Sequence, residues 1–123
     1  MLLLADDAAL RHATRSFLTV EGYRVMSAAT LADAMKVAWH WRDIGILLVN
    51  EPVSDGAMAG RAIVTLRQII GPGLRALLIT GELSADLRAL RHDPLVRLAT
   101  SPIDADALAA QLQALSPESI PTS

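Results

Sequence analysis

Polar side chains follow several short apolar runs in this sequence. The adjacent carboxylates Asp6 and Asp7 come after the first run, and Asn50 ends the run "ILLVN". The hydroxyl groups of Thr80 and Ser101 follow two later runs. In an open parallel sheet, ligands bind in a crevice at the carboxyl ends of the strands. Carboxylate, amide and hydroxyl oxygens of this kind suit Mg²⁺, so these residues predict one oxygen-rich pocket.

The apolar runs predict the strands that position this pocket. They span residues 2–5, 23–27, 46–49, 74–79 and 95–99. Their nearly continuous apolar character is typical of strands covered on both faces. Segments with helical spacing follow each strand. The residues expected to face the sheet include Leu10, Ala13, Phe17 and Leu18 in the first helix, Ala62, Ile63 and Leu66 in the third, and Leu108, Leu112 and Leu115 in the fifth. The alternation predicts a single α/β domain with a doubly wound parallel sheet.

Capping residues support these helix boundaries. Thr30 and Asp104 are suited to begin helices, and Gly22 is suited to end the first one. "GPG" at 71–73 ends the third predicted helix, and Asp93-Pro94 closes the fourth. The proline- and serine-rich residues 116–123 predict a flexible tail, which leaves residues 1–115 as the domain.

Composition excludes several classes of protein. The chain of 123 residues suits one domain and has no cysteine, so a disulfide framework or a thiol nucleophile is impossible. A net charge of −2 with scattered basic residues argues against a nucleic-acid surface. No apolar run has the length of a membrane span, so we expect a soluble, cytoplasmic protein that does not bind a membrane. Hydrophobic residues make up 52% of the chain, which predicts broad buried helix faces or an apolar surface for a partner.

The chain resembles the CheY-like receiver domains of bacterial response regulators. The resemblance is carried by "DD" after the first strand, "GYRVMSA" at 22–28, "LLITGE" at 77–82 and "TSPID" at 100–104. It covers about residues 1–115. It implies a flavodoxin-like (βα)5 fold with strand order 2-1-3-4-5.

The resemblance also implies a chemistry and a set of site residues. In that family a histidine kinase donates a phosphoryl group to an aspartate at the end of the third strand, with Mg²⁺ bound beside it. Asp6 and Asp7 match the acidic pair that holds the metal, and Thr80 matches the switch hydroxyl. Pro102 matches the proline of the family's Lys-Pro segment.

Four functional positions depart from the family pattern. Asn50 stands at the acceptor position, Ser101 at the lysine position and Leu98 at the position of a switching aromatic. Ser54 stands where the family usually has a proline, four residues past the acceptor. An amide is a poor nucleophile compared with a carboxylate, and Ser101 carries no positive charge for a phosphoryl oxygen. Mg²⁺ at Asp6 and Asp7 is expected to be weak or absent, because one carboxylate is missing. The sequence therefore predicts a pseudo-receiver that is not an enzyme and needs no cofactor.

Other interpretations stay open at this stage. Asp6 and Asp7 could simply cap and begin a helix. A receiver with altered chemistry could still bind Mg²⁺, or be phosphorylated elsewhere, for example at Glu51 or Asp55. A small Mg²⁺-dependent phosphatase is a further alternative, although such enzymes that resemble haloacid dehalogenases use a DxD spacing that this chain lacks.

The last predicted helix points to a protein partner. It carries no charge after Asp106, and its outward positions are Ala110, Gln111, Gln113 and Ala114. Solvated helices usually carry lysine and glutamate there. In the receiver family the fourth helix, fifth strand and fifth helix form the usual partner or dimer surface, so the resemblance implies a histidine kinase, an output domain or a second copy as partner. Trp39 and Trp41 are expected to cap the sheet edge, with an aromatic interface patch as the alternative.

Overall fold

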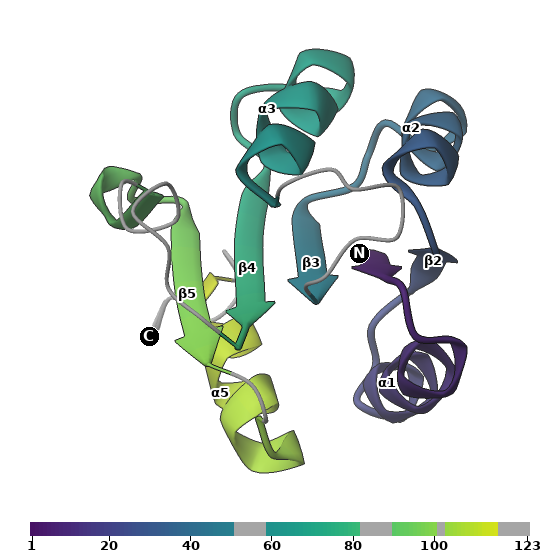
Figure 1. Cartoon of the computed structure of the whole chain (residues 1–123), viewed down its shortest axis with the longest axis vertical. Helices are drawn as coiled ribbons and strands as arrows, with labels where there is room; N and C mark the ends of the chain where they lie inside the picture. Colours follow the sequence, from purple (N-terminus) through teal and green to yellow (C-terminus); the bar gives the residue numbers. More distant parts are fainter. Residues whose placement is uncertain (51–58, 82–89, 101–102, 116–123) are drawn as a thin grey trace.

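The computed structural model describes residues 1–50, 59–81, 90–100 and 103–115. Within these ranges, five parallel strands form one sheet in the order β2-β1-β3-β4-β5 (Figure 1). In chain order the strands are β1 (Leu2–Ala5), β2 (Met26–Ala28), β3 (Ile46–Asn50), β4 (Arg75–Thr80) and β5 (Val96–Thr100). The predicted fold class and strand order are therefore confirmed.

Helices cover both faces of this sheet. They are α1 (Ala8–Val20), α2 (Leu31–His40), α3 (Ala59–Ile70), α5 (Ala105–Leu115) and the short 3₁₀ helix η1 (Leu90–His92). Figure 1 shows α2 and α3 on one face and α1 and α5 on the other. Most of the fourth predicted helix falls on residues 82–89, outside the described residues. None of the described helices combines the length and the apolar character needed to span a membrane.

Two apolar clusters hold the layers together. On the face covered by α2 and α3, Leu47 and Val49 of β3 pack with helix residues such as Ala34 and Leu66. On the opposite face, Leu48 packs in the cluster of side chains from α1 and α5. Successive residues of β3 alternate between the clusters because side chains point to opposite faces of a strand. This two-sided burial explains why the strand sequences are continuously apolar.

The second strand begins three residues later than the sequence predicts. Met26 pairs with Leu2, the first residue of β1, and its N–H donates to the carbonyl of Met1. Because β2 lies at the sheet edge and pairs only with β1, its ladder cannot extend beyond the start of that strand. Tyr23 and Val25 instead pack against the cluster on the side of α1 and α5.

The predicted helix caps are confirmed. The Thr30 hydroxyl accepts a hydrogen bond from the N–H of Asp33, and the Asp104 carboxylate accepts one from Ala107. Gly22 follows α1 with a φ of +100°, in the left-handed region that favours glycine. These interactions span three residues or fewer, so the local sequence is enough to predict them.

The predicted face of α1 is partly wrong. Leu18 is buried as expected, but Leu10 is 42% exposed and Ala13 is also exposed. Arg11, which the apolar pattern did not assign to the sheet side, is partly buried instead. The alanines of α1 are compatible with either environment, so apolar spacing alone could not define the rotation of this helix about its axis.

Candidate functional site

Asn50 is the last residue of the central strand β3. Its register partners are Ala5 at the end of β1 and Ile79 near the end of β4. Ala5 and Ile79 both belong to the cluster on the side of α1 and α5, and Asn50 is partly buried. In-register neighbours of a parallel sheet point to the same face, so the Asn50 amide lies on the side that α1 and α5 cover.

Asp6 and Asp7 lie next to this strand end, directly after β1. Both residues are exposed. Asp7 is the N-cap of α1: its backbone is extended, and its Oδ1 accepts a hydrogen bond of 3.0 Å from the N–H of Leu10. The capping interpretation of Asp7 therefore has a contact that supports it. Asp6 carries the exposed carboxylate between β1 and this cap.

This cap yields the first prediction. Replacing Asp7 with alanine should destabilise the fold by about 1 kcal/mol, because the N–H of Leu10 loses its acceptor. Asp7→Asn should cost only a few tenths of a kcal/mol, since an amide oxygen caps almost as well. Urea unfolding of both variants at neutral pH measures the difference. Equal losses in the two variants would show that the negative charge matters and the cap does not.

Arg11 brings a positive charge to the same edge of the sheet. Its Nη1 donates to the carbonyl oxygen of Ala5 at 2.8 Å and to that of Asp6 at 3.3 Å. Long side chains on a helix point back toward its N-terminus, which explains how a residue in the second turn of α1 reaches the end of β1. Sequence reasoning missed this residue. The available signal was a cation close to a helix N-terminus, where the helix dipole disfavours positive charge.

The described residues at this edge do not by themselves make up a Mg²⁺ site. One oxygen of Asp7 already accepts the capping hydrogen bond, and position 50 supplies a neutral amide. The Arg11 guanidinium donates hydrogen bonds to the backbone carbonyls of Ala5 and Asp6 at the end of β1, so it competes with a metal ion for these oxygens. Within the described ranges, no group of three or more acidic or histidine side chains could hold a metal ion. Hard divalent cations depend on such concentrated negative charge.

The remaining predicted site residues lie around this edge or outside the described residues. Thr80 ends β4, one residue beyond the partner of Asn50, and is 4% exposed. Leu98 lies in the middle of β5 and is partly buried, packed against the cluster on the side of α2 and α3. Ser101 and Pro102 lie outside the described residues, as do Glu51 and Asp55.

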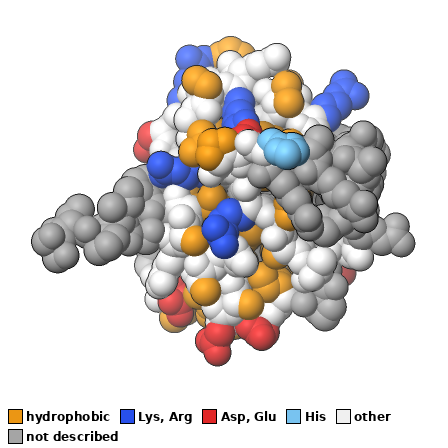
Figure 2. Space-filling view, turned by 90° about the vertical axis from the view of Figure 1, so that its left-hand side faces the viewer, with side chains coloured by type: hydrophobic (Ala, Val, Ile, Leu, Met, Phe, Trp, Pro, Cys, Tyr) orange, Lys and Arg blue, Asp and Glu red, His pale blue; other side chains and the backbone are white. Residues whose placement is uncertain are grey.

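A second candidate region combines the edge strand β5 with helix α5. Arg97 of β5 donates from Nε to Oε1 of Gln111 on α5, so the two elements are joined by a hydrogen bond between side chains. The other three predicted outward residues of α5 are exposed: Ala110, Gln113 and Ala114. Figure 2 views the molecule from the side of β5 and shows hydrophobic side chains interspersed with basic ones.

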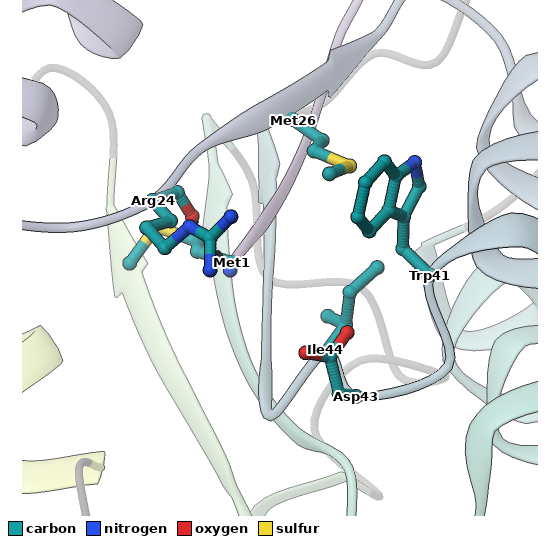
Figure 3. Close-up of a pocket in the computed structure, with 6 residues that line it drawn as sticks. All are labelled: Met1, Arg24, Met26, Trp41, Asp43 and Ile44. Carbon is teal, nitrogen blue, oxygen red and sulfur yellow. Dashed lines mark hydrogen bonds between the residues drawn. The ribbon is translucent and has the colours of Figure 1, made fainter.

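A small pocket lies at the opposite end of the strands from Asn50. It has a volume of about 170 Å³ and is lined by Met1, Arg24, Met26, Trp41, Asp43 and Ile44 (Figure 3). Trp41 lies beside Met26 of the edge strand β2, as the sheet-edge interpretation of the tryptophans predicts. Trp39 is 57% exposed, and the Arg42 guanidinium lies 4.4 Å from its ring centroid. The pocket contains none of the predicted site residues.

Comparison with known proteins supports the fold. No protein-family model and no curated protein matches the sequence. Three solved structures illustrate its structural similarities. The Vibrio cholerae chemotaxis protein CheY4 is 19% identical, with a TM-score of 0.79 over 94% of this chain and 96% of that chain. The receiver domain of the hybrid histidine kinase CckA is 22% identical, with a TM-score of 0.76 over 94% of this chain and 97% of that chain.

The third structure is the beryllofluoride-activated NtrC4 receiver domain dimer. It is 19% identical, with a TM-score of 0.78 over 95% of each chain. Each of the three structures matches nearly the whole chain. The CckA and NtrC4 structures are described by name as receiver domains. The chain therefore has the fold of the CheY-like response-regulator receiver domains.

Proposed function

We propose that this chain is a receiver-like signalling domain that does not accept a phosphoryl group. The observation that carries the proposal is Asn50 at the end of β3, in register with the ends of β1 and β4. An amide nitrogen has no free lone pair, and an amide oxygen is a much weaker nucleophile than a carboxylate. The domain is then not an enzyme, needs no cofactor, and acts in the cytoplasm by binding other proteins.

The surface formed by β5 and α5 is the proposed binding region. Ala110, Gln113 and Ala114 expose small or uncharged side chains, which cost less to desolvate against a partner than charged side chains do. Receivers of similar structure include one from a hybrid histidine kinase and one described as a dimer. By analogy, the proposed partner is a histidine kinase, an output domain or a second copy of this chain.

Phosphodonor labelling tests the central claim. The native protein, incubated with acetyl phosphate and Mg²⁺, is expected to show no added phosphoryl group by intact-mass spectrometry. A receiver with an aspartate acceptor, treated in parallel, serves as the positive control. A hydroxylamine-sensitive phosphoryl group on the native chain would overturn the proposal and support the alternative of a receiver with altered chemistry. Peptide mapping would then decide whether Glu51, Asp55 or another residue accepts it.

A further inference from the structure

The Arg11 guanidinium lies where the strand ends meet. It donates to the carbonyls of Ala5 and Asp6, and Ala5 is the register partner of Asn50. Helix α1, which carries Arg11, covers the sheet face on which the Asn50 amide lies (Figure 1). The positive charge is thus held against the same edge as Asp6, Asp7 and Asn50 by contacts to the backbone.

The needs of helix α1 do not explain this placement. Asp7 already caps the N-terminus of α1, and the helix dipole does not favour a cation one turn further on. Burial of an apolar side chain would stabilise the helix against the sheet, yet Leu10 is 42% exposed while Arg11 is partly buried. The helix therefore presents a charged residue to the sheet edge and a leucine to solvent. This arrangement favours a role for Arg11 in the pocket.

We propose that Arg11 is a tethered cation that takes the place of a divalent metal in this pocket. Its charge lies at the same edge as the carboxylates of Asp6 and Asp7, bound to the backbone carbonyls beside them, and repels a free divalent cation from that edge. Asn50 is consistent with this arrangement, because a third carboxylate would raise the excess of negative charge over the one positive charge of Arg11 from one to two. The inference rests on the proposed function, in which the pocket has no metal-dependent reaction to perform.

Titration with Mg²⁺ alone tests the inference. Backbone amide chemical shifts of residues 5–7 and 50 are followed by NMR in the native protein, in Asn50→Asp and in the double variant Asn50→Asp/Arg11→Gln. The native protein is expected to show no saturable shifts in the millimolar range. The double variant is expected to bind Mg²⁺ at least about 10-fold more tightly than Asn50→Asp, because the competing charge is gone.

Arg15 provides a matched control, since it is exposed on the same helix one turn further on. Asn50→Asp/Arg15→Gln loses the same formal charge but keeps the contacts of Arg11, so its Mg²⁺ affinity should stay within about twofold of that of Asn50→Asp. Circular dichroism checks that every variant is folded, and Arg11→Met, which keeps much of the apolar stem but removes the charge, replaces Arg11→Gln if the latter unfolds. In that case the methionine variant must also bind more tightly than Asn50→Asp.

Three outcomes would contradict the role of Arg11. The first is saturable binding of Mg²⁺ by the native protein in the millimolar range. The second is an equal Mg²⁺ affinity of Asn50→Asp and Asn50→Asp/Arg11→Gln. The third is a gain in affinity from Arg15→Gln as large as the gain from Arg11→Gln. None of them requires phosphoryl transfer, so the inference can fail while the proposed function stands. Conversely, labelling of the native chain by acetyl phosphate would overturn the proposed function whatever the Mg²⁺ titration shows.

Discussion

Replacing Leu48 with alanine is expected to remove about 3–4 kcal/mol of stability, the largest loss among the substitutions considered. Leu48 lies in the central strand β3, is fully buried, and belongs to the cluster that α1 and α5 form with the sheet. Its neighbours on β1 and β4 are also fixed by the ladder, so the surroundings cannot collapse into the space left behind. For a small domain such a loss is a large part of the total stability, which is about 5–15 kcal/mol.

Urea unfolding followed by tryptophan fluorescence measures this loss. Val64 on α3 provides the control, because its side chain is 57% exposed. Val64→Ala should change the unfolding midpoint little, since surface substitutions usually fall within about 0.5 kcal/mol. A loss below about 1 kcal/mol for Leu48→Ala would mean that the sheet is not packed as tightly as the structure describes.

The second large effect is expected at Arg67, which links helix α3 by hydrogen bonds to the segments just before β4 and β5. From α3, its Nε and Nη2 donate to the carbonyl of Leu74 at 3.1 and 3.0 Å, and its Nη1 binds the carboxylate of Asp93. Asp93 also accepts a hydrogen bond from the N–H of Leu95, just before β5. We expect Arg67→Met to cost about 2 kcal/mol at neutral pH, because several hydrogen bonds of partly buried groups are lost together.

This loss should depend on pH in a defined direction. The hydrogen bond from Arg67 lowers the pKa of Asp93, partial burial opposes it, and the Leu95 N–H adds to the lowering. A carboxylate with a lowered pKa stabilises the fold fully above its unfolded value of about 4, and this stability is lost as the pH falls through the folded value. The difference between native protein and Arg67→Met should therefore shrink below about pH 4.

Unfolding curves for Arg67→Met and the native protein at neutral and acidic pH provide the measurement. Arg61→Met is the control, because Arg61 is exposed on the same helix. It should leave stability nearly unchanged at both pH values. If Arg67→Met and the native protein differ equally at neutral and acidic pH, the ionised Asp93 carboxylate does not contribute to this contact.

Much of this molecule follows from local sequence. Uninterrupted apolar runs such as 46–49 are typical of strands buried on both faces, and their alternation with segments of helical spacing predicts the parallel sheet without any structure. Thr30 and Asp104 cap helices through contacts within three residues, which is why these caps could be predicted. Asn50 could be located at a strand end because the apolar run stops there.

Other features depend on the packing of distant segments. The start of β2 at Met26 is set by the start of its partner β1, and the contact between Arg67 and Asp93 joins residues 26 positions apart. The sheet-facing position of Arg11 depends on how α1 is rotated against β1. Alanine-rich helices leave that rotation undefined in the sequence, because alanine is tolerated on either side of a helix. Local sequence thus predicted most of the described elements and the uncharged side chain at position 50, whereas only tertiary packing decided that Arg11 lies at the same edge of the sheet.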